Sequence, residues 1–369
     1  MMSLKLIIQL AAIALFMGAI PLIINAYRGN KLGLHHLSSI TLFITFDLVL
    51  FGAFTRLTDS GLGCPDWPGC YGHSNPLLAS EQISLAQSQM PFGPVTESKA
   101  WIEMLHRYFA SGVGFLILSI AILSWTNRKK IEKWITNLAI GLFFLVCLQG
   151  AFGAFTVTLK LQPIIVTIHL LLALLLLMGL VVFNHATHLN YRELKKDPKY
   201  LRVHTIGLLM VCSIQIFLGA WVSTNYAVLA CQDFPSCNGS FMPPMDFQNG
   251  FTLWRELGKT VTGDYLPIQA LIAIHWLHRV FAAIVFLSVI TFYFNYRKLS
   301  LSGSSNWHLI LRKWLKILVG LVVLQFVTGI SNVVLNWPLI AALIHTGGAA
   351  LLIITATKLL LLASPKPNY

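Results

Sequence analysis

Apolar residues in this chain occur in long runs separated by short polar connections. A helix needs about 20 mainly apolar residues to cross the hydrocarbon core of a bilayer. Nine runs approach or exceed that length, at residues 4–26, 37–55, 103–126, 134–155, 163–185, 203–225, 268–294, 314–333 and 338–362. A helix satisfies its own backbone hydrogen bonds in lipid. The pattern therefore predicts an all-α protein that crosses a membrane many times.

Basic residues collect in alternate connections between these runs. They are Arg28 and Lys31; Arg128, Lys129, Lys130 and Lys133; Arg192, Lys195, Lys196, Lys199 and Arg202; and Arg297, Lys298, Arg312, Lys313 and Lys316. Lysine and arginine favour the cytoplasmic side of a membrane. The remaining connections, 56–102, 156–162, 226–267 and 334–337, are then expected outside.

Composition supports a membrane protein and excludes a nucleic-acid partner. The chain is 56% hydrophobic and 11% charged, too apolar for a soluble domain. The basic residues behind its net charge of +13 lie in the connections, where they set the orientation of the chain in the membrane. The first run has the alternative of a cleaved signal peptide, but no clear small-x-small cleavage site follows it. We expect an extra transmembrane helix with an external N-terminus.

The chain contains an internal duplication. The segment 51–55 (Phe-Gly-Ala-Phe-Thr) matches 218–222 (Leu-Gly-Ala-Trp-Val) at an offset of 167 residues. The same offset relates the cysteines, Cys64 and Cys70 to Cys231 and Cys237. An offset of 172 relates His106-Arg107 to His278-Arg279, and one of 176 relates Gln149, Gly153 and His169 to Gln325, Gly329 and His345. The glycines are explained by close helix approach.

The duplication predicts the domain organisation. Each repeat has four spans, an even number, so both copies have the same orientation. We expect two tandem pseudo-symmetric four-helix bundles related by an axis along the membrane normal. Residues 1–36 form the extra helix and a basic loop, 37–190 the first half, 191–202 a basic cytoplasmic linker and 203–369 the second half.

Four histidines at equivalent positions are the main candidates for chemistry: His106 with His169, and His278 with His345. A single intramembrane histidine is usually a hydrogen-bonding residue between helices. Ionisable groups are costly in lipid, however, and two facing imidazoles can hold a haem iron. Zinc or copper would favour a third or fourth ligand, and none is placed symmetrically. At about 1.5 Å per residue, all four lie in the outer half of the bilayer.

The residues around the first histidine of each pair differ between the halves. Arg107 and Arg279 each follow a histidine, and either could pair with a haem propionate or extend to the lipid headgroups. Glu103 in the first half is replaced by His275 in the second. A carboxylate near a macrocycle can accept a proton or stabilise positive charge, although capping of the helix start is an alternative. The first half is therefore the expected reaction site and the second a permanent haem site.

Each external loop contains two cysteines with five residues between them. Disulfides Cys64–Cys70 and Cys231–Cys237 are the simplest pairing in an oxidising compartment. They would shape a lid over each pocket, and thiol–disulfide exchange is the alternative role. Cys147 and Cys212 lie within spans and are expected to be inert.

These features together resemble the haem A synthase family of membrane enzymes, over residues from about 45 to 362. The resemblance rests on the run 55–70 (Thr-Arg-Leu-Thr-Asp-Ser-Gly-Leu-Gly-Cys-Pro-Asp-Trp-Pro-Gly-Cys), the motif Glu103-x-x-His106-Arg107, the other three histidines and the two cysteine pairs. The extra span at 4–26 departs from the usual eight-helix pattern of the family.

The resemblance implies an oxidoreductase that converts haem O to haem A for cytochrome oxidase. The methyl group at C8 would be hydroxylated successively to a gem-diol, which loses water to give a formyl group. His106 and His169 would hold the substrate haem O, and Glu103 would assist the oxidation. His278 and His345 would ligate a haem B that carries electrons.

Location and partners follow from the same resemblance. We expect a bacterial inner-membrane protein with its cysteine loops and haem sites toward the periplasm, and an electron-transfer partner of unknown identity. Haem O synthase is a candidate donor of the greasy substrate, and a homo-oligomer is compatible with the apolar outer faces. A dihaem electron-transfer protein, a haem carrier and a disulfide-exchange protein are the competing functions.

Overall fold

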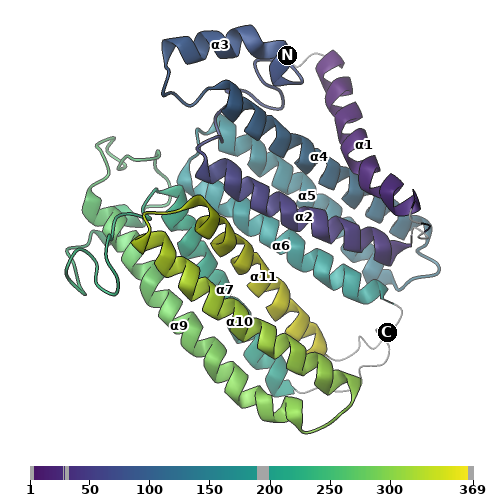
Figure 1. Cartoon of the computed structure of the whole chain (residues 1–369). Coiled ribbons are helices and arrows are strands. Elements are labelled where there is room, and N and C mark those ends of the chain that lie inside the picture. Colours follow the sequence, from purple (N-terminus) through teal and green to yellow (C-terminus); the bar gives the residue numbers. More distant parts are fainter. Residues whose placement is uncertain (1–3, 28, 30–32, 189–198, 365–369) are drawn as a thin grey trace. The chain divides into compact units, whose positions relative to one another are not determined.

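The computed structural model describes the whole chain except residues 1–3, 28, 30–32, 189–198 and 365–369 (Figure 1). Its long helices are α1 Leu4–Tyr27, α2 Leu34–Leu57, α4 Glu97–Thr126, α5 Lys133–Thr158, α6 Pro163–Thr187, α7 Lys199–Thr224, α9 Ile268–Leu301, α10 Asn306–Val334 and α11 Leu339–Ala363. Within the described residues, these nine are long and apolar enough to cross a membrane. The predicted all-α, multi-span class is confirmed.

Several helices are longer than their apolar runs. α4 begins at Glu97, six residues before the apolar run, and the Thr96 side chain caps it by accepting a hydrogen bond from Lys99 N at 3.3 Å. α9 and α10 likewise continue into polar sequence at their basic ends. The apolar runs identify only the part of each helix that lipid covers. The polar turns that extend beyond the bilayer therefore could not be predicted from them.

The chain divides into two units, Met1–His188 and Leu189–Tyr369. In the first unit, α2 packs against α4 and α6, and α5 packs against the same two helices. The four helices thus form a closed ring in which α4 and α6 stand diagonally opposite (Figure 1). Leu116, Ile117, Leu142 and Phe183 are buried at its centre.

The extra helix α1 packs against α4. Two glycines allow the close approach: a Cβ at Gly18 would lie 2.4 Å from the Phe115 ring, and one at Gly112 would lie 2.9 Å from Met17 Cβ. The structure thus places α1 on the first unit as an integral helix. The orientation of its N-terminus and its retention in the mature chain stay predictions.

The second unit repeats the ring arrangement. α7 packs against α9 and α11, and α10 packs against the same two, so α9 and α11 are the diagonal pair. Trp221, Val289 and Leu311 are fully buried in this unit. Most of the predicted linker 191–202 lies outside the described residues, and Lys199 begins α7. The symmetry axis between the halves stays a prediction.

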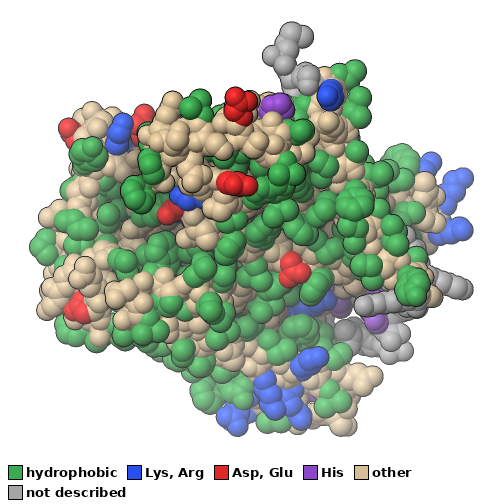
Figure 2. Space-filling view, turned by 45° about the horizontal axis from the view of Figure 1, so that its top comes forward, with side chains coloured by type: hydrophobic (Ala, Val, Ile, Leu, Met, Phe, Trp, Pro, Cys, Tyr) green, Lys and Arg blue, Asp and Glu red, His purple; other side chains and the backbone are tan. Residues whose placement is uncertain are grey.

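The outer faces of the helices are apolar, as a lipid environment requires. Phe43, Phe144 and Leu287 are 65%, 66% and 64% exposed. Figure 2 shows hydrophobic side chains across most of the visible face, with Lys and Arg side chains gathered near its edges. The loops carry short elements: η1 Pro76–Ala79, α3 Ser80–Gln89 and α8 Phe247–Gly250.

Candidate paired-histidine sites

Each histidine pair lies on the two diagonal helices of its unit. His106 is on α4 and His169 on α6, and they are close enough to interact electrostatically. His278 on α9 and His345 on α11 have the same relation in the second unit. Diagonal helices face each other across the bundle interior. The structure therefore brings together the histidines that the duplication paired.

Every one of the four imidazole rings packs against a glycine of a neighbouring helix. A Cβ at Gly52 would lie 3.0 Å from His106 Nε2, and one at Gly219 would lie 2.9 Å from His278 Cε1. The corresponding distances are 3.3 Å from Gly153 to His169 and 3.4 Å from Gly329 to His345. These glycines were attributed to helix approach from the sequence. The structure shows a more specific reason: they leave room for the imidazole rings.

The available side chains suit a metal held by two protein ligands better than a metal held by three or four. Among the described residues, no three His, Cys, Asp or Glu side chains cluster as metal ligands. His169 Nδ1 is buried with no hydrogen-bond partner. Neutral imidazoles presented in pairs suit a haem iron, which takes its four equatorial bonds from the macrocycle. The residues present therefore fit haem in both units.

A disulfide closes the cysteine-containing loop of each unit. Cys64 and Cys70 are joined with an S–S distance of 2.11 Å, and Cys231 and Cys237 with one of 1.93 Å. All four cysteines are buried. Cys212 is also buried and Cys147 is exposed on α5, and both are free thiols.

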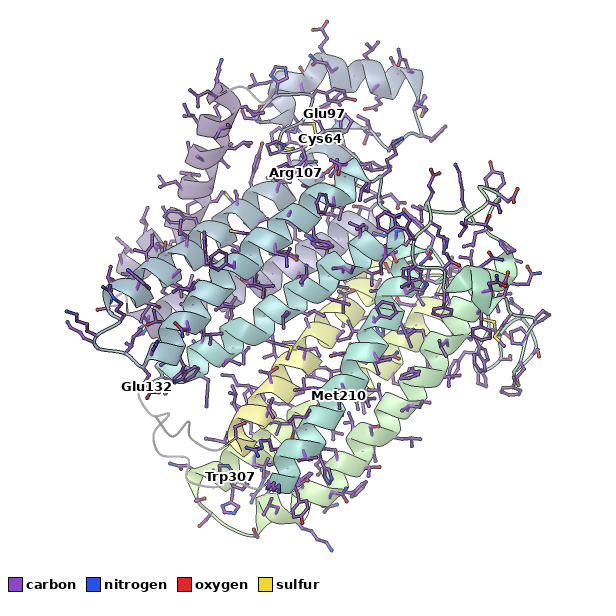
Figure 3. All side chains as sticks on the ribbon, turned by 180° about the vertical axis from the view of Figure 1, so that it is seen from behind. Cys64, Glu97, Arg107, Glu132, Met210 and Trp307 are labelled. Atoms are coloured by element: carbon purple, nitrogen blue, oxygen red, sulfur yellow. A yellow bond between two sulfur atoms is a disulfide. The ribbon has the colours of Figure 1, made fainter. Side chains whose placement is uncertain are left out.

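The arginine after each first histidine holds the loop in place. Arg107 Nη1 donates to the carbonyls of Asp66, Pro68 and Gly69, at 2.9, 3.3 and 2.6 Å. Figure 3 shows Arg107 and Cys64 at the same end of the first unit. Arg279 in the second unit donates to the carbonyls of Asp233, Ser236 and Cys231 at 2.8, 2.8 and 3.0 Å. Loop anchoring is a role that the sequence analysis missed.

Glu103 lies at the junction of the loop and α4. Its Oε1 accepts a hydrogen bond from Arg107 Nη2 at 2.5 Å, and Oε2 accepts one from Cys64 N at 2.8 Å. The side chain is only 5% exposed. Removing one partner of a buried ion pair typically destabilises a protein by about 3–5 kcal/mol, because the other charge is left buried and unpaired. Glu103 therefore couples the disulfide loop to the turn of α4 that carries His106.

His275 takes the place of Glu103 in the second unit. Its Nε2 accepts a hydrogen bond from Arg279 Nε at 3.2 Å. The imidazole is buried at 4% exposure. Both units therefore place an acceptor one turn before the loop-anchoring arginine. Only the acceptor in the first unit is a carboxylate.

An aspartate organises the interior of each disulfide loop. Asp66 accepts hydrogen bonds from the amides of Tyr71 and Gly72 at 2.6 and 2.8 Å. Asp233 accepts from the amides of Asn238 and Gly239 and from the Ser236 hydroxyl. These bonds hold the pKa of the Asp233 carboxyl below its usual value, with the Ser236 hydroxyl contributing most. The loops are matched in fold as well as in sequence.

Polar partners of the histidines complete the sites. Gln149 Nε2 donates to the backbone carbonyl of His169 at 3.0 Å. In the second unit, Gln215 and Thr328 reach the rings of His278 and His345 directly. Neither residue was singled out from the sequence. A comparison of the two copies could have identified them, because these two positions are polar in the second copy alone.

Fold and site together define a multi-span membrane protein with two duplicated paired-histidine sites, each beneath a disulfide loop. The family model for the cytochrome oxidase assembly protein COX15-CtaA matches residues 35–357. The chain belongs to this family.

The relatives of the chain share one name. It is 39% identical over 318 residues to the Heme A synthase of Shewanella oneidensis, a match that covers 86% of this chain and 92% of the relative. It is 26% identical to the Heme A synthase of Halalkalibacterium halodurans, with the same coverage of both chains. It is 28% identical to that of Alkalihalophilus pseudofirmus, over 81% of this chain and 86% of the relative.

Proposed function

We propose that the protein is a haem A synthase, an oxidoreductase that converts the C8 methyl group of haem O to a formyl group. Two repeated histidine pairs, only one of which has a carboxylate one turn away, are the observation that carries the proposal. The family membership and the shared name of the relatives support it.

The first unit is the proposed substrate site. His106 and His169 would bind the iron of haem O from opposite faces, in the space that Gly52 and Gly153 leave open. The disulfide loop lies at the external end of α4 and would exclude water from the reacting edge. The membrane around the unit suits a substrate with a long apolar tail.

Glu103 is the proposed catalytic residue. Both carboxylate oxygens are already hydrogen-bonded, but each has a second lone pair available to accept a proton. Arg107 and the Cys64 amide hold the carboxylate in one orientation, which is the preorganisation that electrostatic catalysis requires. The carboxylate would take up a proton or stabilise positive charge as the methyl group is oxidised.

The second unit is the proposed site of a resident haem B. His278 and His345 would hold its iron, and the group would supply electron transfer for the first site. Arg279 would pair with one of its propionates. The loops and both sites would face the periplasm, as the basic connections predict, with an unidentified electron acceptor and with haem O synthase as the candidate donor of substrate.

The test is extraction and mass analysis of haems from cells that make haem O, with and without this protein. We expect haem A that depends on the protein, together with co-purifying haem B. Glu103→Ala should retain bound haem and abolish formyl formation, because the proton acceptor is lost. Glu97→Gln, in the first turn of the same helix, is the matched control and should be active.

Two outcomes would contradict the proposal. Normal haem A yield from Glu103→Ala would exclude a catalytic role for Glu103. Bound haem with no change in haem O would favour a dihaem electron-transfer protein or a carrier. Glu103→Gln separates anchoring from catalysis, because an amide oxygen can still accept from Cys64 N while the carboxylate charge is lost.

A further inference from the structure

The rings of the two second-unit histidines have hydrogen-bonding side chains beside them. Thr328 Oγ1 lies 2.9 Å from His345 Nδ1, and Gln215 Nε2 lies 3.0 Å from His278 Nδ1. Thr328 directly precedes Gly329, and Gln215 lies one turn before Gly219 on the same face of α7. The helices that make room for the rings therefore also orient them.

The hydroxyl of Thr328 favours one tautomer of His345. It lies within donating distance of the carbonyls of Leu324 and Gln325, at 2.8 and 3.3 Å, the usual bonds of a threonine within a helix. With its proton donated to a carbonyl, the oxygen is placed to accept Nδ1–H from the ring. A neutral imidazole with its proton on Nδ1 has a free lone pair on Nε2, which is the atom that would bind iron.

Gln215 orients His278 from the neighbouring helix. Its Nε2 lies 3.0 Å from the ring Nδ1 and 3.5 Å from the ring Nε2, and it donates to the His278 backbone carbonyl at 3.2 Å. The amide therefore contacts both the ring and the backbone of the same histidine, which limits how the ring can turn.

The first unit has no counterpart to either residue. At the offset of 167 residues, Gln215 corresponds to Leu48, and at the offset of 176, Thr328 corresponds to Phe152. His169 Nδ1 is buried without a partner. In the part of the chain that the structure describes, no side chain is hydrogen-bonded to the His106 ring; Phe51 packs against it edge-on with ring centroids 5.9 Å apart.

We propose that Gln215 and Thr328 are positioning residues that make the second histidine pair a permanent haem site, and that Leu48 and Phe152 leave the first pair suited to haem exchange. The inference rests on the proposed function and extends it. A hydrogen bond to Nδ1–H fixes the tautomer and orientation of a ligating histidine and raises its basicity, and losing such a partner costs about 10–100-fold in metal affinity. A substrate site must release its product, so the absence of this hydrogen bond suits its function.

The test uses the full-length protein purified with its haem. In Thr328→Val, we expect haem B to dissociate at least about 10-fold faster, with a higher midpoint potential because the ring becomes less electron-donating. Thr328→Ser keeps the hydroxyl and should restore both values. Thr346→Val is the matched control: it removes a hydroxyl next to His345 that bonds only the carbonyl of Ala342, at 3.1 Å. It should leave both values unchanged.

The reciprocal change is made in the first unit. Leu48→Gln should slow the loss of haem added to that site, in a protein whose second site is already filled. Gln215→Leu should weaken retention in the second unit by a similar factor to Thr328→Val. Dissociation is followed by transfer to apomyoglobin, and the potential by spectroelectrochemical titration, so neither readout depends on turnover.

The outcomes separate the inference from the proposed function. If the parent protein retains haem B and Thr328→Val and Gln215→Leu leave its dissociation rate and potential unchanged, the inference is wrong and the proposed function stands. Failure of Thr328→Ser to restore the parent values would also overturn it, since a packing role is then sufficient. If the parent binds no haem, the proposed function itself fails.

Discussion

The loop-anchoring arginines of the two units make equivalent hydrogen bonds to loop carbonyls. They differ in the side chain that each contacts one turn earlier on its helix. Arg107 is paired with the Glu103 carboxylate, whereas Arg279 donates to the neutral ring of His275. Among the described residues, no carboxylate lies within ion-pair distance of Arg279. The first loop is therefore anchored by an ion pair, and the second by a cation that contacts a neutral ring and backbone carbonyls.

This difference assigns different chemistry to two copies of one fold. In the first unit the charge of the arginine is already balanced, so the pair can hold the loop and present a carboxylate near the substrate. In the second unit, as far as the structure describes it, the half-buried Arg279 has no carboxylate within ion-pair distance, and a haem propionate is the anion that the proposed function would supply. Under the proposed function, the replacement of Glu103 by His275 is one of the differences that separate the roles of the two units.

The largest expected effect comes from removing a ligand of the second unit. His278→Ala or His345→Ala should eliminate the spectrum of a haem held by two histidines and weaken haem retention, because the iron would keep only one imidazole. The reduced absorption spectrum of the purified protein measures this. His204→Gln, on α7 near the opposite end of the unit, is the control. An unchanged reduced spectrum in either ligand variant would refute the pairing.

A smaller effect should distinguish the two arginines. Arg279→Gln should weaken haem retention in the second unit at least about 10-fold, since a charge-assisted bond to a propionate contributes about 1.5–3 kcal/mol. Arg107→Gln should leave that retention unchanged and loosen the first loop, which is measured as faster reduction of the Cys64–Cys70 disulfide. Equal haem retention in the two variants would show that the charge difference between the surroundings of the two arginines does not affect haem binding.

The glycines beside the rings should show a graded effect. Gly219→Ala should reduce haem content more than Gly329→Ala, because the added carbon would lie 2.9 Å from the His278 ring and 3.4 Å from the His345 ring. Overpacking typically costs about 1–3 kcal/mol. Haem absorbance per protein measures occupancy. The reverse order would show that the rings turn away from these glycines when haem binds.

The smallest effect concerns pH and the second disulfide loop. The pKa of Asp233 is lowered in the fold, so its contribution to loop stability is full above its unfolded pKa of about 3.9. That contribution is lost as the pH falls through the lower folded value. Reduction of Cys231–Cys237 by a phosphine, which does not act through a thiolate, should therefore become faster below about pH 4 relative to the Asp233→Asn variant, whose pH dependence should be flatter. An unchanged pH profile in the variant would exclude Asp233.

The sequence predicted the spans, the all-α class and the equivalent histidines, because periodic apolar runs and a duplication are both visible in one dimension. It missed the anchoring role of Arg107 and Arg279, because their acceptors are backbone carbonyls that carry no side-chain signature. It also assigned Gly52 and Gly219 to general helix approach, since only three-dimensional packing shows that the approaching group is an imidazole.

Helix α1 gives the first unit a flank that the second unit lacks in the described residues. Leu10, Ile13 and Met17 pack against the buried cluster formed by the first disulfide loop and the start of α4. Protein, not lipid, therefore covers that side of the loop. Under the proposed function, a substrate that enters the first site from the membrane would have to approach between helices other than α1 and α4 at this depth, because α1 covers the outer side of α4 there.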